Sequence, residues 1–169
     1  GGTPEILDRL EAGMKHYAAV IQEKLGADAD HFEGAGAAGG LGAAFKVFLK
    51  ANMKSGIETV LDLIDFDGLL EGVDLVVTGE GRIDWQSAFG KVPSGIGMRC
   101  KKKGIPAVAI VGGMGDGAEK IFDFGVESIL PTINGAMDIE EALDRAVELY
   151  KGAADRMFRM VKVGMEMEK

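Results

Sequence analysis

The sequence predicts an α/β fold in which helices flank a mainly parallel sheet. Three short apolar runs rich in β-branched residues, at 73–79, 107–113 and 126–132, have the pattern of strands buried on both faces. Segments with helical periodicity, at 94–103 and 117–124, separate these runs. Strands that alternate with helices form βαβ units, whose strands lie parallel in one sheet.

The composition of the chain is that of one globular domain. Its 169 residues are 47% hydrophobic and 27% charged, an ordinary balance for a chain that buries a core. The formal net charge of −8 argues against a nucleic-acid-binding protein, because phosphate contacts need a basic face. The single cysteine, Cys100, fits a reducing cytoplasm, and its apolar helical surroundings favour a core thiol over a nucleophile. No apolar run reaches the roughly 18 residues of a membrane-spanning helix.

Helical segments precede the first predicted strand. Thr3 and Pro4 have the pattern of an N-cap and a first helical residue, and Gly26 ends the amphipathic pattern that follows. A polar linker then leads to a glycine-rich turn, 34–42, which is predicted to open a second helix. Two short helices are predicted within 57–72.

The last segment is predicted to be one long helix. Asp138 has the position of an N-cap with Glu141 as its capping-box partner, and the helix is expected to run from Ile139 towards Met160. An apolar stripe along it is predicted to pack on the core. Its members are Ile139, Leu143, Ala146, Tyr150, Ala153, Met157 and Met160.

The segment 73–95 holds the densest group of ionisable residues. Glu80 and Asp84 follow a predicted strand, and their carboxylates can hold Mg²⁺ or accept a proton from a substrate hydroxyl. Arg82 offers a planar fork for a carboxylate or phosphate, and Lys91 offers a compact positive charge. Ligands gather at the carboxyl ends of parallel strands, so this inventory favours a phosphoryl-transfer site. An internal salt bridge between Glu80 and Arg82 is the structural alternative.

Two further glycine-rich turns have both a functional and a structural interpretation. Gly34, Gly36 and Gly39 have the GxGxxG spacing that brings backbone amides to a phosphate, but the segment before them is a poor strand. Close helix packing explains that spacing as well. The turn 112–117 follows a strand and could present amides to an anion while Asp116 caps the next helix; a plain βα turn is the alternative.

Three segments, in this order, resemble the bacterial glycerate kinase family of the glyoxylate and glucarate pathways. They are GAGAAGGLGAA, DLVVTGEGRIDWQSAFGKVPSG and GIPAVAIVGG. The second is similar to the family pattern TGEGxxDxQTxxGKxPxGV. The residues that match it are Thr78, Gly79, Glu80, Gly81, Asp84, Gln86, Gly90, Lys91, Pro93 and Gly95. Ser87 replaces the usual threonine and keeps its hydroxyl, and Ile96 replaces the usual valine and keeps an apolar shape.

The resemblance implies a longer, two-domain α/β enzyme whose active site lies in the cleft between its domains. Residues 1–169 would be its C-terminal portion, with the N-terminal domain absent. The implied reaction transfers the γ-phosphoryl group of ATP to a hydroxyl of D-glycerate with Mg²⁺, and 2-phosphoglycerate is favoured over the 3-isomer as product. We expect the isolated chain to be inactive, the protein to be cytoplasmic, and association into homo-oligomers to be one way of covering exposed apolar surface.

The resemblance also implies roles for individual residues. Arg82 or Lys91 would neutralise a carboxylate or phosphate, and Glu80 and Asp84 would act as metal ligand or base. Further residues expected to bind substrate or nucleotide are Gly36, Gly39, Gly40, Thr78, Gly79, Gly81, Gln86 and Ser87. Two other interpretations are an NAD-dependent dehydrogenase and a non-catalytic α/β module that binds a small anionic metabolite. The acids, base and guanidinium of 73–95 favour the kinase.

Overall fold

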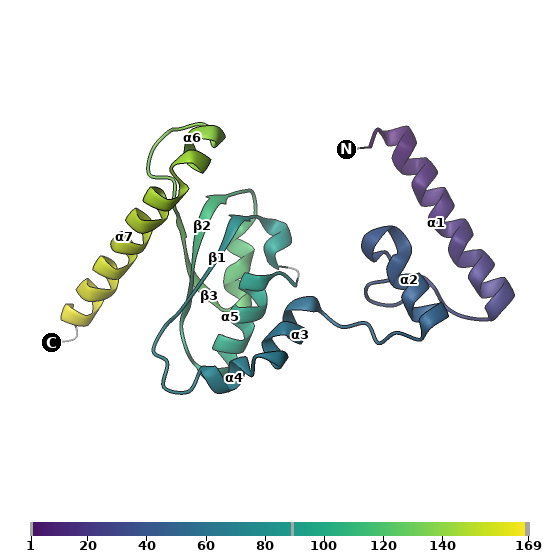
Figure 1. The fold of residues 1–169 in the computed structure, drawn as a ribbon, viewed down its shortest axis with the longest axis horizontal. Coiled ribbons are helices and arrows are strands. Elements are labelled where there is room, and N and C mark those ends of the chain that lie inside the picture. The colour runs from purple at the N-terminus through teal and green to yellow at the C-terminus, as the bar shows by residue number, and fades with distance from the viewer. Residues whose placement is uncertain (1, 89, 168–169) are drawn as a thin grey trace. The chain divides into compact units, whose positions relative to one another are not determined.

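The computed structural model describes residues 2–88 and 90–167, and the chain divides into two compact units, 1–54 and 55–169 (Figure 1). Length and composition alone indicated a single domain. The irregular segment 50–55, which forms no helix or strand, joins the two units.

The first unit consists of α1 (Pro4–Leu25), α2 (Ala37–Leu49) and the irregular chain between them. The predicted start and end of α1 are confirmed. The Oγ1 atom of Thr3 accepts a hydrogen bond from the Ile6 N–H at 3.4 Å, and Gly26 ends the helix with φ of 62°. A small core holds the unit together, made of Ile21, Ala29, Ala43 and Val47.

The second unit contains the predicted parallel sheet. Strands β1 (Val76–Ile83), β2 (Ala107–Met114) and β3 (Val126–Pro131) lie in the order β1-β2-β3, and both pairings are parallel. The prediction of a parallel sheet is confirmed. The first strand begins and ends later than predicted, because Gly79 pairs with Ile110 of β2 and the strand continues to Ile83 instead of ending at the glycine.

Burial on both faces was predicted for all three strands, and it holds best for β2. Since β2 is the central strand, it has a neighbour on each side, whereas β1 is an edge strand of the described sheet. In β1 only Thr78 and Ile83 are buried, and Val77 is 39% exposed. The prediction was therefore wrong for β1.

Helices cover the sheet on both faces. Along β2, Ala109 and Val111 pack in one cluster with Ile121, and Ile110, which points the other way, packs with Ala153 and Met157. The connecting elements are α3 (Gly56–Leu63), α4 (Phe66–Leu69), η1 (Trp85–Ala88), α5 (Val92–Lys103) and η2 (Ala118–Phe124), where η denotes a 3₁₀ helix. This arrangement places the loops after β1 and β2 at one edge of the sheet.

Cys100 of α5 confirms the prediction of a core thiol. Its side chain is fully buried, in a cluster with Leu70 and Ala107. Burial raises the pKa of the thiol above its ordinary value, so the reactive thiolate is disfavoured at neutral pH.

The predicted C-terminal helix consists of two helices, α6 (Ile139–Asp144) and α7 (Ala146–Met167). The cap is confirmed, because the Glu141 N–H donates to the Asp138 carboxylate at 2.8 Å. Arg145 interrupts the helix with φ of −99° and ψ of 12°.

The break at Arg145 changes which side chains face the sheet. The buried residues of α7 are Leu149, Ala153 and Met157, of which the predicted stripe contained the last two. Five members of that stripe are exposed, so the prediction was wrong for Ile139, Leu143, Ala146, Tyr150 and Met160. No helix in the described part of the chain combines the length and the apolar composition that crossing a membrane requires.

Candidate active site

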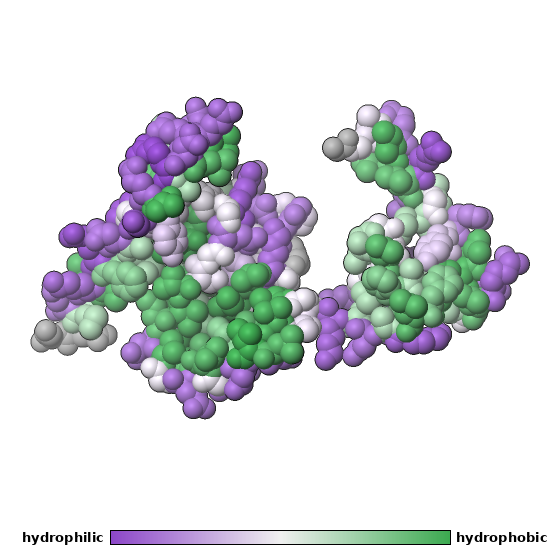
Figure 2. Space-filling view, in the orientation of Figure 1, coloured by the Kyte–Doolittle hydropathy of each residue, from purple (hydrophilic) through white to green (hydrophobic). Residues whose placement is uncertain are grey.

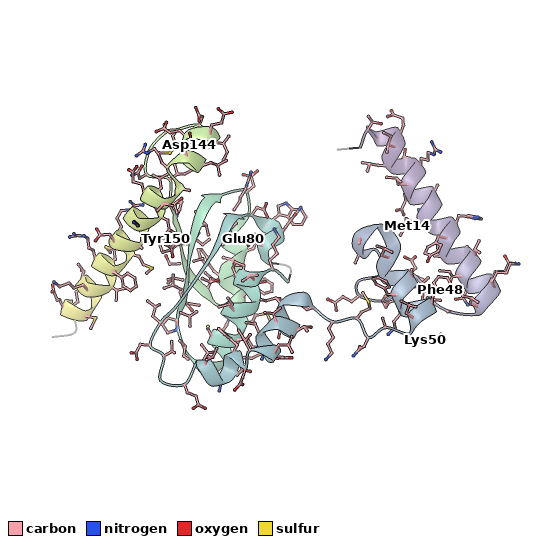
Figure 3. The ribbon with its side chains drawn as sticks, viewed as in Figure 1. Met14, Phe48, Lys50, Glu80, Asp144 and Tyr150 are labelled. Atoms are coloured by element: carbon pink, nitrogen blue, oxygen red, sulfur yellow. The ribbon has the colours of Figure 1, made fainter. Side chains whose placement is uncertain are left out.

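The carboxyl end of β1 carries the predicted acidic and basic side chains. Glu80 pairs with Val111 of β2 and Arg82 pairs with Gly113, and Asp84 follows the strand directly. Figure 3 shows Glu80 on the sheet, among the side chains of the second unit. Ligands ordinarily bind at the carboxyl ends of the strands of a parallel sheet.

Glu80 of β1 and Lys91, at the start of α5, form an ion pair near the carboxyl end of β1. The Lys91 Nζ atom lies 3.8 Å from the Glu80 Oε1 atom, and the two side chains are 40% and 27% exposed. A separation of 3.8 Å is an ion pair without a hydrogen bond. Lys91 reaches this position because it is the N-cap residue of α5. Glu80 therefore pairs with Lys91, and the alternative of a structural salt bridge to Arg82 is wrong.

The second carboxylate oxygen of Glu80 has no hydrogen-bond donor in the described part of the chain. The Oε2 atom is buried, and among the described residues it accepts no hydrogen bond. Buried carboxylate oxygens are ordinarily satisfied, because an unpaired one loses its hydration without compensation. This oxygen is consequently placed to accept a hydrogen bond or to coordinate a cation.

Arg82 and Asp84 both lie against Gly115, in the loop after β2. A Cβ atom at this position would lie 2.7 Å from the Arg82 Nη2 atom and 3.2 Å from the Asp84 Cβ atom. Arg82 is exposed, and among the described residues its guanidinium makes no ion pair. The sequence predicted Gly115 to be part of an anion-binding turn or a plain βα turn, and the structure shows that it makes room for the guanidinium.

Asp84 begins a tight turn that uses Ser87 and the backbone of Gln86. The Gln86 N–H donates to the Asp84 Oδ1 atom at 2.9 Å, and the Asp84 N–H donates to the Ser87 Oγ atom at 3.2 Å. Ser87 is fully buried, whereas Gln86 is exposed. The Ser87 hydroxyl thus stabilises the turn that holds Asp84, and its predicted contact with a ligand stays a prediction.

The loops after β1 and β2 are joined by backbone hydrogen bonds. The Gly115 N–H donates to the Ile83 carbonyl at 2.7 Å, and the Trp85 N–H donates to the Asp116 carbonyl at 3.0 Å. The N-cap of η2 is Gly117, with φ of 72°, and its side-chain position is filled by Trp85. The prediction that Asp116 caps this helix was wrong, because the left-handed backbone at Gly117 takes the cap position.

The remaining motif residues of β1 lie within the ladder. Thr78 is buried, and a Cβ atom on Gly79 would lie 2.7 Å from the Ile110 carbonyl oxygen. Gly81 is exposed, and a Cβ atom there would meet nothing within 4 Å. Gly79 is needed for close strand pairing, and the ligand contacts predicted for the three residues stay predictions.

A hollow lies beside the Glu80–Lys91 pair, and we call it the α3–α5 hollow. It has a volume of about 340 Å³. It is lined by Gly56, Ile57, Val60, Glu80, Gly90, Lys91 and Val92. The part played by α3 could not be predicted from the sequence, because the residues that approach the pair from α3 are apolar and carry no chemical signal.

The glycine turn of the first unit has an unusual backbone. Ala38, Gly39 and Gly40 have φ of 51°, 68° and 97°, so the regular part of α2 follows them. Gly36 and Gly39 border a hollow of about 360 Å³, whereas Gly40 is buried against Met14, labelled in Figure 3. No strand precedes this turn in the described chain, so the fingerprint of an NAD site is incomplete.

The described residues suit an Mg²⁺ ion that is held by only one or two protein ligands. They contain no group of three or more His, Cys, Asp or Glu side chains close enough to enclose a metal. Mg²⁺ is ordinarily held by one or two carboxylates together with substrate phosphates, so a protein cage is not required. The buried, unpartnered Oε2 atom of Glu80 suits that mode.

The comparisons with known proteins agree on one family. The model of the glycerate kinase family matches residues 1–162. The glycerate kinase of Bacillus subtilis (strain 168) is 34% identical over 99% of this chain and 44% of its own length. The glycerate 2-kinase of Escherichia coli (strain K12) is 34% identical over 98% of this chain and 43% of its own length.

A solved structure from Salmonella typhimurium LT2, provisionally named glycerate kinase 2, is 35% identical to this chain. Its TM-score is 0.68, over 98% of this chain and 42% of the other. The chain thus spans less than half the length of these relatives. The family match over residues 1–162 includes both the glycine turn and the Glu80–Lys91 pair. It shows that the protein belongs to the glycerate kinase family.

Proposed function

We propose that this chain carries part of the active site of an ATP-dependent glycerate kinase. The observation that carries the proposal is the Glu80 carboxylate, which lines a hollow together with Lys91 and whose buried Oε2 atom has no donor among the described residues. A substrate hydroxyl would supply that donor. Relatives named glycerate kinase and glycerate 2-kinase support this choice of substrate, and the second name supports 2-phosphoglycerate as product.

In the proposed reaction, the hydroxyl oxygen of D-glycerate forms a bond to the γ-phosphorus of ATP. The bond between that phosphorus and the oxygen bridging to the β-phosphorus breaks, and ADP leaves with the electron pair. The hydroxyl proton passes to Glu80, with Asp84 as the second candidate base. Lys91 and Arg82 neutralise negative charge, and most of the rate enhancement comes from positioning and charge.

Of Glu80 and Asp84, the carboxylate that does not act as the base would hold Mg²⁺, and the bound ion would neutralise phosphate charge. Gly36 and Gly39 of the first unit are the residues proposed for the nucleotide, because they border a hollow. Since the chain spans less than half the length of its relatives, the proposal assigns the remaining catalytic groups to a further domain of the protein. We also propose that the protein is located in the cytoplasm.

The test is ADP release by the complete translation product of the gene, with D-glycerate and MgATP. Turnover is expected for the wild type. Glu80→Gln should lower kcat by about 10²–10⁴-fold, the contribution typical of general acid–base catalysis. Glu119→Gln, an exposed position in the first turn of η2, is the matched control and should keep full activity.

Three results would contradict the proposal, the first two in part and the third as a whole. Full kcat in Glu80→Gln would remove Glu80 from the base role, and full kcat in Asp84→Asn would do the same for Asp84. Binding of D-glycerate without any turnover by the wild type would favour a metabolite-binding module over a kinase.

A further inference from the structure

We infer that the α3–α5 hollow receives the phosphoryl acceptor, a small hydroxy acid, and that Val60 and Ile57 of α3 limit the size of the acid. The inference rests on the proposed function. It goes further by assigning the groups around Glu80 to the acceptor and not to the nucleotide.

The charges of the hollow suit a hydroxy acid. Among the described residues it contains one cation, Lys91, and one anion, Glu80. Their separation of 3.8 Å leaves each side chain able to bind a further partner. A carboxylate can pair with the Lys91 ammonium while a neighbouring hydroxyl donates to the Glu80 carboxylate. A triphosphate would bring several negative charges next to the Glu80 carboxylate, with only one lysine to offset them.

The size and lining of the hollow point the same way. Its volume of about 340 Å³ lies at the lower end of the roughly 300–1,000 Å³ typical of ligand pockets. Apart from the charged pair, the described side chains that line it are those of Ile57, Val60 and Val92. An apolar wall with two convergent polar groups suits the carbon chain of a small acid. Its described residues offer no set of hydrogen-bond donors for the nucleobase and ribose of a nucleotide.

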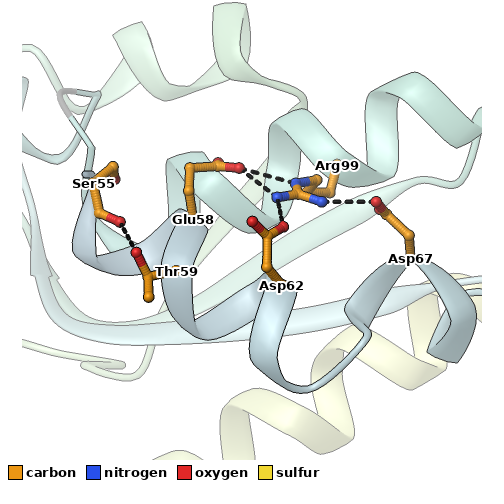
Figure 4. A network of polar contacts seen from close by, with 6 residues as sticks. All are labelled: Ser55, Glu58, Thr59, Asp62, Asp67 and Arg99. Atoms are coloured by element: carbon orange, nitrogen blue, oxygen red, sulfur yellow. Dashed lines mark hydrogen bonds and ion pairs between the residues drawn. The ribbon is translucent and has the colours of Figure 1, made fainter. Parts of the chain in front are cut away.

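The wall formed by α3 is held in place from two directions. A Cβ atom on Gly95 of α5 would lie 2.5 Å from the Ile57 Cγ1 atom, so Ile57 packs directly on the α5 backbone. Arg99 of α5 also binds Glu58 and Asp62 of α3, with hydrogen bonds of 2.5–3.0 Å (Figure 4). Because α3 is fixed in this way, the width of the hollow is set by the fold before any ligand arrives.

The experiment uses Val60→Phe in the complete gene product. Val60 is 53% exposed, so a larger side chain can be accommodated without disturbing the core, and an unchanged melting temperature would confirm this. We expect the KM for D-glycerate to rise at least about tenfold, because one unaccommodated methylene group already costs 10- to 200-fold in a fitted pocket. The KM for ATP should stay within experimental error.

Two further variants sharpen the result. Val60→Ala should raise kcat/KM for a four-carbon hydroxy acid relative to D-glycerate. Val147→Phe is the matched control, because Val147 is 69% exposed on α7 and does not line the hollow. It should leave both KM values unchanged.

The inference would be overturned if Val60→Phe raised the KM for ATP alone, or changed neither KM. In both cases the glycerate kinase activity itself would survive. If the wild type showed no turnover, calorimetric binding of D-glycerate would separate the two proposals. Binding that Val60→Phe abolishes would support the acid site and reject the kinase, whereas binding unaffected by Val60→Phe would reject the acid site as well.

Discussion

Two glycines of the sheet allow its first two strands to approach closely. Gly79 of β1 lies against the Ile110 carbonyl, and a Cβ atom on Gly112 of β2 would overlap the Gly81 carbonyl oxygen. Both obstacles are backbone atoms, which cannot rotate away as a flexible side chain can. The sequence shows that glycines are concentrated here, and they were predicted to serve as hinges and as amide donors to a ligand. Which glycine contacts which backbone depends on the β1–β2 register, which sequence periodicity does not give.

The neighbouring glycines of β2 provide a matched pair of variants. Gly112→Ala should lower the free energy of unfolding by about 1–3 kcal/mol, as overpacking of a tightly packed site ordinarily does. Gly113→Ala should leave it nearly unchanged, because a Cβ atom at Gly113 meets nothing within 4 Å. Chemical denaturation followed by circular dichroism measures both. Equal stabilities of the two variants would show that the strands can separate without cost.

Arg99 is the main polar link between the helices on one side of the sheet. Its side chain is only 14% exposed, and it binds Glu58 and Asp62 of α3 and Asp67 of α4 (Figure 4). The three carboxylates raise the pKa of the guanidinium above its ordinary value, so it stays charged throughout the accessible pH range. The partners of Arg99 could not be predicted from the sequence, because the acidic residues that it binds lie more than thirty positions earlier in the chain.

Arg99→Ala should lower the melting temperature by several degrees, since it leaves three carboxylates close together without a cation. Arg159→Ala is the control, because Arg159 forms an (i, i+4) pair with Asp155 in which both side chains are mostly exposed. Such exposed pairs contribute little, so the control should melt near the wild type. Thermal unfolding monitored by circular dichroism gives both values. A control that loses as much as Arg99→Ala would mean that the network does not stabilise the fold.

Elements with local signals could be predicted from the sequence, and elements that depend on tertiary packing could not. The cap at Thr3, the end at Gly26 and the cap at Asp138 depend only on neighbouring residues, and all three are confirmed. The break at Arg145 was missed, because arginine is a good helix former and neither proline nor glycine marks the position. In the candidate site, the residues of β1 were predicted from their chemistry, and their roles stay predictions. The α3 wall was not predicted, because Ile57 and Val60 are apolar.

At the scale of the whole molecule, the two units meet at the irregular segment 50–55. Lys54 is exposed there, and Lys50 takes a left-handed conformation at the end of α2. Trypsin needs an unfolded stretch of chain, so it should cut after one of these two residues first. The exposed lysines 101–103 serve as the internal control, because they lie within α5. Mass spectrometry of early fragments identifies the site, and a first cut within α5 would contradict the division.

The second unit also exposes apolar surface around α3, where Figure 2 shows hydrophobic side chains gathered together. The exposed residues of α3, α4 and the turn between them are Val60, Leu63, Ile64 and Leu69. Patches of this kind mark surfaces that bind another part of a protein or a ligand. Val60 belongs both to this patch and to the α3–α5 hollow, so burial of the patch would also close one side of the hollow.

Trp85 gives this family member an optical reporter that needs no label. It is the only tryptophan of the chain, and it is 49% exposed in the turn that begins at Asp84. Indole emission shifts in wavelength and intensity when the solvent around the ring is displaced. Because residues 1–169 contain no other tryptophan, titrating this chain with a hydroxy acid, a nucleotide or a metal reports events at the end of β1, whether or not any phosphate is transferred.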